Sequence, residues 1–186
     1  MACCGQATAL DLSMSITARG GIFATMDTSI ANLPNKVTTP ATDEIRITRL
    51  FAAPRKLVFQ AWASPEMLVN WFGCNAFATI SAEAEVRTGG SWRVVMRAPD
   101  GEEFPAYGTY LEVKDPERLH FTHHWEKIVA GVNPANHTTT VTVEFFEVEE
   151  DTRMEFRQIG LATEASRDSH IGGWSDSFDK LYLQLM

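Results

Sequence analysis

The spacing of hydrophobic residues along this chain changes from a strand pattern to a helix pattern and back. In the first strand pattern, Ile45 and Ile47 alternate with Arg46 and Thr48, and a period of two predicts a β-strand with one buried face. The spacing becomes helical after Pro54, which suits a helix start because its missing N–H costs little there. The apolar face of this helix comprises Leu57, Val58, Ala61 and Trp62.

A second short helix is predicted directly after the first. Ser64 is a suitable N-cap, and Pro65 takes the first helical position. The apolar residues that follow at helical spacing are Leu68, Trp71 and Phe72. Two helices joined this tightly should form a V-shaped lid.

Alternation returns in the middle of the chain and predicts a series of strands. They are expected at residues 77–87, 91–98, 104–113, 117–126, 138–148 and 152–159. Turn signals such as Gly89-Gly90 and Asp115-Pro116 separate them, which is typical of a meander of hairpins. The stretch 129–137 lacks alternation and predicts a longer mobile loop.

The chain closes on an amphipathic run that begins near Thr163 or Ser166 and reaches Met186. Its apolar stripe comprises His170, Trp174, Phe178, Leu181 and Leu185. A helix of roughly 20 residues spans about 30 Å, which is enough to cross a whole sheet. Gly172-Gly173 would each weaken the helix by up to about 1 kcal/mol, so they predict a close backbone approach or a kink.

This order of elements predicts the fold class. A strand, two short helices, a run of strands and one long helix favour an α+β fold, in which a curved antiparallel sheet wraps around the C-terminal helix. A sheet of that shape encloses a pocket on its concave face.

Short motifs along the chain add a resemblance to this pattern. In order, they are Ala53-Pro54-Arg55, Val58-Phe59, Ala61-Trp62, Pro65-Glu66 with Trp71, Glu85-Val86-Arg87, Gly89-Gly90, Trp92-Arg93, Pro99-Asp100-Gly101, Pro116-Glu117-Arg118-Leu119, Gln158-Ile159-Gly160 and Gly173-Trp174. Through them the chain resembles the SRPBCC or START-like superfamily, in the branch similar to the C-terminal domain of the activator of the heat-shock-protein-90 ATPase. The resemblance implies a helix-grip domain over residues 44–186, a fold that commonly keeps a cavity between sheet and helix. It implies no catalytic signature.

Residues 1–43 lie outside this resemblance. They are rich in Ala, Ser, Thr, Asn and Gly and show no sustained hydrophobic period. A segment with so little to bury predicts a flexible N-terminal extension.

Composition narrows the classes of partner. The formal charge of −8 and the pI near 5.1 argue against nucleic-acid binding, which needs a cationic surface. The cysteines, Cys3, Cys4 and Cys74, show neither a disulfide framework nor metal-ligand spacing. No apolar run approaches the roughly 18 residues that a membrane helix needs. We therefore expect a cytoplasmic protein with no membrane span, no metal and no cofactor.

The parity of the strands selects candidate residues for a ligand cavity. The residues expected to face it are Trp71, Trp92, Met96, Tyr107, Phe121, His123, Trp125, Phe145, Gln158, His170, Trp174 and Phe178. The alternative is that the apolar residues interdigitate as a dry core and that the polar ones are satisfied by backbone or water. Given the resemblance, we expect a cavity in which His123, His170, Gln158 and Tyr107 orient a mostly apolar ligand.

Charged residues offer a weaker catalytic hypothesis. Glu83, Glu85 and Arg87 share one strand face, and paired carboxylates can support acid-base chemistry. A solvated ladder that pairs with Arg93 or Arg97 on the next strand is the preferred interpretation.

Three functions follow as hypotheses. The first is a small cytosolic protein that holds a hydrophobic small molecule. The second, implied by the resemblance, is a co-chaperone-like domain whose partner is a chaperone, another protein or a second copy of this chain. The third and least favoured is an enzyme of the cyclase or hydrolase kind with His123 or a carboxylate as general base. Fold alone does not choose among them.

Overall fold

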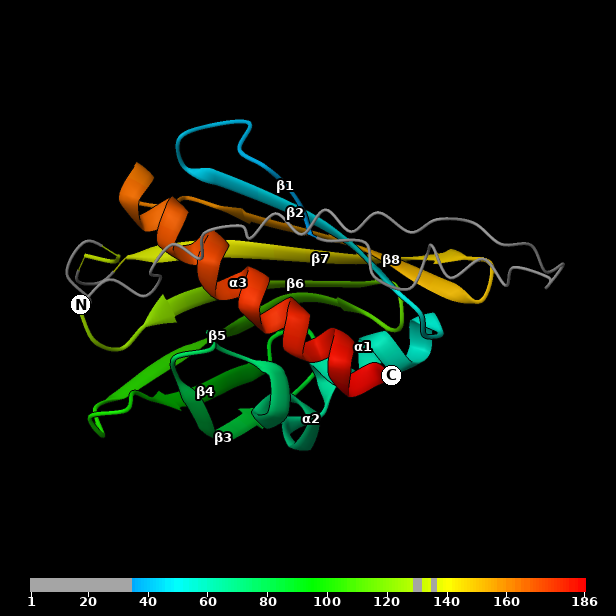
Figure 1. Ribbon diagram of the computed structural model, residues 1–186, viewed down its shortest axis with the longest axis horizontal. Helices are drawn as coiled ribbons and strands as arrows, with labels where there is room; N and C mark the ends of the chain where they lie inside the picture. The colour runs from blue at the N-terminus through cyan, green and yellow to red at the C-terminus, as the bar shows by residue number, and fades with distance from the viewer. Residues whose placement is uncertain (1–34, 129–131, 135–136) are drawn as a thin grey trace, which may run out of the picture.

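One antiparallel sheet, curved around the last helix, organises the protein in the computed structural model, which describes residues 35–128, 132–134 and 137–186. Its elements are β1 (Lys36–Thr38), β2 (Glu44–Phe51), α1 (Arg55–Ala63), α2 (Pro65–Trp71), β3 (Ala78–Ala84), β4 (Ser91–Arg97), β5 (Glu103–Lys114), β6 (Arg118–Trp125), β7 (Thr138–Val148), β8 (Asp151–Ile159) and α3 (Glu164–Leu185). The eight strands lie in the order β1-β2-β8-β7-β6-β5-β4-β3. Helix α3 crosses the sheet obliquely and ends beside α1 (Figure 1).

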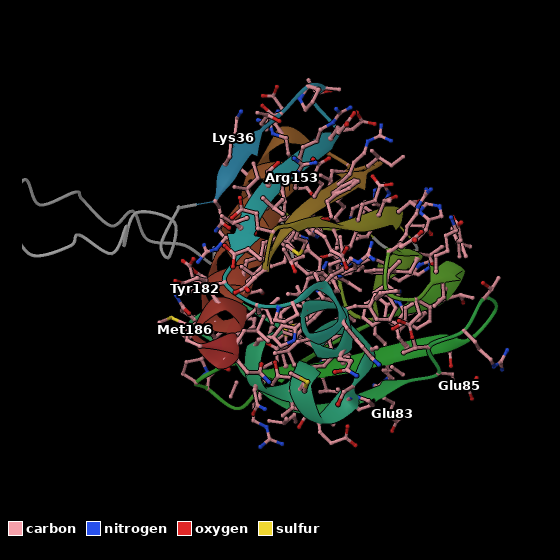
Figure 2. The ribbon with its side chains drawn as sticks, turned by 90° about the vertical axis from the view of Figure 1, so that its right-hand side faces the viewer. Lys36, Glu83, Glu85, Arg153, Tyr182 and Met186 are labelled. Atoms are coloured by element: carbon pink, nitrogen blue, oxygen red, sulfur yellow. The ribbon has the colours of Figure 1, made fainter. Side chains whose placement is uncertain are left out.

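The predicted helix-grip fold is confirmed. In a view turned by 90° about the vertical axis, the sheet curves from Lys36 at one edge to Glu83 at the other, and side chains fill its concave face (Figure 2). The predicted start of α2 is also confirmed, because the Ser64 hydroxyl accepts a hydrogen bond from the Met67 backbone N–H and Pro65 occupies the first turn. Helix α1 begins one residue after Pro54, which serves as its N-cap.

Strand β3 is shorter than the alternation predicted. It ends at Ala84 because the following backbone closes on itself as a turn: the Glu85 carbonyl accepts from the Arg87 N–H, and the Arg87 carbonyl from the Gly90 N–H. A Cβ at Gly90 would lie 2.0 Å from the Glu85 oxygen, so only glycine fits there.

Strand β1 lies upstream of the boundary expected at Glu44. Its three residues pair with β2, and Lys36 stands opposite Thr48. The side chain of Asn35 then ties this segment to α3, since its Nδ2 donates to the Ser175 carbonyl at 3.4 Å. So short a strand carries no detectable hydrophobic period. The remainder of the predicted extension, residues 1–34, lies outside the described residues.

Strands β5 and β6 approach each other closely where the sheet bends. A Cβ on Gly108 would lie 1.7 Å from the carbonyl oxygen of Thr122. That oxygen accepts a hydrogen bond from Trp92 Nε1 at 3.1 Å, while Thr122 Oγ1 accepts from the Thr109 N–H at 3.0 Å. A tryptophan and a threonine side chain thus replace ladder hydrogen bonds at the bend.

Among the described residues, no helix has the length and apolar character to span a membrane.

Candidate functional site

The concave face of the sheet brings together nearly all residues predicted to line a cavity. Those that are buried or packed against the buried core are Trp71, Trp92, Met96, Phe121, His123, Trp125, Phe145, Gln158, His170, Trp174 and Phe178. They come from α2, the inner faces of β4, β6, β7 and β8, and from α3. These residues therefore lie between the sheet and α3, on the faces to which the sequence spacing assigned them.

Tyr107 is the exception and lies on the opposite face of the sheet. Its side chain is 41% exposed and stacks on His124 with ring centroids 5.1 Å apart. The register explains this: Trp92 pairs with Gly108, which places Tyr107 beside the outward-facing Arg93. The sequence-based assignment of Tyr107 to the cavity is wrong because parity on β5 is decided by its pairing with β4.

The middle of the concave face is filled by aromatic rings. The ring centroid of Trp174 lies 4.6 Å from that of Phe156, 5.4 Å from Phe72 and 6.1 Å from Trp62. Trp62 also contacts Trp71 and Phe178. Sequence analysis placed Trp62 on the apolar face of a helix but missed its central position. At this point the dry-core alternative describes the packing correctly.

Polar groups gather instead beneath the N-terminal half of α3. Trp125 Nε1 donates a hydrogen bond to His170 Nε2 at 3.1 Å. Because Nε2 is an acceptor, the ring proton lies on Nδ1, which donates to the Ser166 carbonyl at 2.8 Å. Burial lowers the pKa of His170 below its ordinary value. His170 is thus a neutral imidazole with both ring nitrogens occupied.

A second chain of hydrogen bonds runs from α3 through β8 and β7 to β6. Trp174 Nε1 donates to Gln158 Oε1 at 2.7 Å, and Gln158 Nε2 donates to Thr139 Oγ1 at 2.8 Å. The Thr139 hydroxyl donates in turn to the backbone carbonyl of His123 at 3.3 Å. This chain satisfies buried polar groups that would otherwise destabilise the core.

His123 lies at the centre of these groups in a cage of rings. Its ring centroid lies 5.5 Å from Trp125, 5.6 Å from Trp92, 6.0 Å from His170 and 6.2 Å from Trp174. Burial lowers the pKa of His123 to about 3, and the nearby His170 and His124 act in the same direction. Within the described part of the chain, its buried Nδ1 atom has no hydrogen-bond partner. His123 is therefore a neutral imidazole whose Nδ1 atom is unused.

The flank of α3 beside this cage is open at Gly173. A Cβ built on Gly173 would meet no described residue within 4 Å, and the helix runs unbroken from Glu164 to Leu185. The predicted close backbone approach is therefore wrong for Gly173. Along the same flank, the Ser166 hydroxyl donates to the Val132 carbonyl, and Ser177 Oγ accepts from the Gly73 N–H at 3.0 Å. Gly173 lies between these two attachments.

Chemically, this arrangement suits binding better than proton transfer. The charges that shift the pKa of His123 belong to histidines, and no carboxylate is among them. A general base needs a polarised or charged environment that tunes its pKa toward the working pH, whereas the pKa of His123 is displaced far below it. Within the part of the chain that the structure describes, no group of three or more His, Cys, Asp or Glu is placed to hold a metal ion.

An inward-facing arginine was missed by the sequence analysis. The guanidinium of Arg49 is 3% exposed, contacts Asn35 and Asp179 through Nη1, and lies 5.1 Å from the ring centroid of Tyr182. The signal in the sequence was its position: Arg49 follows Ile47 by two residues, so it shares the buried face of the strand with Ile45 and Ile47. Arg49 lies under the C-terminal half of α3, away from the histidine cage.

The acidic residues Glu83 and Glu85 are solvated, as expected, but the ion pairs differ from those predicted. Glu85 pairs with Arg87 in the same turn at 2.9 Å, whereas Arg93 pairs with Glu126 at 2.9 Å. Glu83 and Glu85 lie at the outer rim of the sheet (Figure 2). Together with Arg93 and Tyr107 they line a groove of about 580 Å³ on the outer face.

Comparison with known proteins agrees with this architecture. The family model described as Activator of Hsp90 ATPase homolog 1-like protein matches residues 52–185. No curated protein sequence matches the chain.

Solved structures share the fold along most of the chain. A crystal structure of a protein from Nitrosomonas europaea is 28% identical, covers 79% of this chain and 96% of its own, and superposes with a TM-score of 0.66. One from Rhodobacter sphaeroides is 21% identical, covers 81% and 97%, and gives 0.68. The AHSA1 protein from Silicibacter pomeroyi is 23% identical, covers 76% and 96%, and gives 0.65.

Proposed function

The chain belongs to the Activator of Hsp90 ATPase homolog 1-like family, and we propose that it binds a neutral, largely apolar small molecule beneath the N-terminal half of α3. The observation that carries this proposal is the histidine cage, which we define as His123 with Trp92, Trp125, His170 and Trp174.

The distribution of polar groups supports this location. A buried polar group costs free energy unless it is paired, so a core that only had to be stable would gain little from it. Here the buried His123, His170, Gln158 and Thr139 all lie on one side of the core. A few polar groups among aromatic walls are typical of small-molecule sites. The other side of the core, around Trp62, consists of packed aromatic rings, and we assign it a structural role.

Two further features supply access and charge selection. We place the approach to the cage at Gly173, where a Cβ would meet no described residue within 4 Å and the next residue is Trp174 of the cage. The imidazoles of His123 and His170 are both kept neutral by burial, since the pKa of each lies below its ordinary value. An ionic ligand would find no buried counter-charge in the cage, so the site favours a neutral molecule.

A thermal-shift screen of fatty acids, sterols, flavonoids and isoprenoids tests the proposal, together with native mass spectrometry of the purified protein. A ligand that binds only the folded state raises its stability by about 2.7 kcal/mol at a hundredfold excess over Kd. We expect at least one hit, with higher affinity for a neutral compound than for its carboxylate analogue. The proposal fails if no compound shifts the melting temperature and no small molecule is retained.

Gly173 provides a matched pair of variants for the same screen. Gly173→Leu should fill the open flank and weaken binding at least tenfold, whereas Gly173→Ala should leave binding within about twofold because a methyl group meets no neighbour. Equal binding by the two variants would show that ligands do not approach past Gly173.

A second candidate function is favoured by the outer groove. Its lining by Glu83, Glu85, Arg93 and Tyr107 at the edge strand β3 offers exposed charge and unpaired backbone to a protein partner. We test this with the family's named partner by measuring the ATPase rate of purified Hsp90 with and without the protein. Stimulation that Glu83→Arg abolishes, and that Gly173→Leu leaves intact, would favour the protein-interaction function.

A further inference from the structure

Within the proposed binding function, on which this inference rests, we infer that the ligand carries a neutral hydroxyl or N–H group that pairs with Nδ1 of His123. The ligand class is then a hydroxylated or N–H-bearing ring compound, as distinct from a plain hydrocarbon or a fatty acid.

The unpaired state of Nδ1 distinguishes it from the other polar atoms around it. Both ring nitrogens of His170 are hydrogen-bonded, and so are Nε1 of Trp92, Trp125 and Trp174. Gln158 uses both its oxygen and its nitrogen. Among the described residues, Nδ1 of His123 is the one buried polar atom of the cage without a partner, and Nε1 of Trp62, beside the cage, is a second such atom. A buried polar atom without a hydrogen bond, in a network whose other members are paired, indicates that a further group binds there.

The chemistry of a neutral imidazole selects the group that can pair with it. A hydroxyl donates and accepts, so it complements Nδ1 in either tautomer of His123. A hydrocarbon would leave the nitrogen unpaired. A carboxylate or ammonium would bring a buried charge into a cage whose other walls are neutral rings.

The spacing of the cage limits how the ligand approaches. The surrounding ring centroids lie 5.5–6.2 Å from that of His123, which is the separation of rings in direct contact, so no further aromatic ring fits between them. A small polar group reaches Nδ1 with the least movement of these rings. We place the remainder of the molecule toward the open flank at Gly173.

Two nearly isosteric probes test this inference on the full chain. 2-Naphthol carries a neutral hydroxyl where 2-methylnaphthalene carries a methyl group, and 2-naphthoate supplies an anion of the same frame. Isothermal titration calorimetry gives the affinity ratio of the first two. Since the methyl compound is more hydrophobic, the informative quantity is how this ratio changes when His123 is replaced by Phe. We expect the change to reduce the preference for 2-naphthol by about ten- to a hundredfold.

Two controls keep the test decisive. Binding of 2-naphthol to wild-type protein labelled with ¹⁵N-histidine should shift the Nδ1 resonance of His123, and this readout requires no variant to fold. His120→Phe, which removes a histidine bonded to Thr142, should leave the ratio unchanged.

The outcomes distinguish a failure of the hydroxyl inference from a failure of the proposed binding function. Binding of both naphthalenes with an unchanged ratio in His123→Phe, or no shift at Nδ1, overturns the hydroxyl inference and leaves the binding function standing. Tighter binding of 2-naphthoate also overturns the inference. Absence of binding by every probe, together with a negative screen, overturns the proposed function.

Discussion

The two halves of α3 face the same sheet but are packed in different ways. The C-terminal half buries Phe178 and Leu181 completely among rings and aliphatic side chains. The N-terminal half buries His170 and Trp174, whose polar atoms are bonded to Trp125 and Gln158. The first half has the composition of a structural core, and the second has that of a site.

Under the proposed function, this contrast assigns two purposes to one helix. Close packing of apolar side chains stabilises the contact between α3 and the sheet, and it does not depend on the direction of individual bonds. Hydrogen bonds from ring nitrogens demand fixed geometry, and they hold the aromatic walls at set angles. We infer that the C-terminal half keeps α3 on the sheet while the N-terminal half can respond to a ligand.

The largest expected effect comes from truncating one buried ring in each half. Trp174→Ala and Phe178→Ala should each lower the free energy of unfolding by about 3–5 kcal/mol, as measured by urea denaturation. Trp174→Ala should also abolish ligand binding, whereas Phe178→Ala should retain it in the folded fraction. A loss below about 1 kcal/mol at Trp174 would contradict its buried position.

Acid should destabilise the N-terminal half selectively. The native pKa of His123 is about 3, below its ordinary 6.5, so the unfolded state binds more protons as the pH falls below about 6.5. Stability is therefore fully present above that pH and declines until the pH reaches the native value. For His123 the loss between pH 7 and pH 5 is about 2 kcal/mol.

Chemical denaturation at a series of pH values measures this dependence. His123→Phe should flatten it, and His120→Phe on the outer face should not. The lowered pKa of Glu44, about 2, acts in a more acidic window because its ordinary value is 4.5. An unchanged pH profile in His123→Phe would show that His123 does not control the acid response.

In the C-terminal half, the pair of Arg49 and Asp179 should respond to charge removal. Asp179→Ala leaves a buried guanidinium without its anionic partner and should destabilise by about 1–2 kcal/mol; because Asp179 is 58% exposed, water limits the loss. Arg49→Met should cost less, since it removes the buried charge itself. Thermal unfolding of both variants checks the order, and equal losses would argue against a buried-charge effect. Ligand affinity should change in neither.

The smallest expected effect is a gain in the N-terminal half. Gly173→Ala should raise the free energy of unfolding by up to about 1 kcal/mol, because alanine favours the helix and its methyl group meets no neighbour. Differential scanning calorimetry can resolve it. A loss of stability would show that the flank at Gly173 is closed in solution.

Much of the fold could be predicted from local sequence patterns. The alternation at Ile45 and Ile47, the helical stripe of α3 and the cap at Ser64 depend on residues close in sequence, so their structures follow from steric and hydrogen-bonding rules within a few positions. The motifs along the chain added the helix-grip architecture, and the family match supports it.

Tertiary pairing decided the rest. Tyr107 points outward because of the register between β4 and β5, and β1 exists because β2 offers a free edge. Sequence spacing placed His123 on the inner face of the sheet and His170 on the apolar stripe of α3. Only the packed structure shows that His170 is fully bonded while Nδ1 of His123 is not. Hydrogen-bond satisfaction depends on atoms from distant strands meeting within about 3 Å, and no local pattern in the sequence records that geometry.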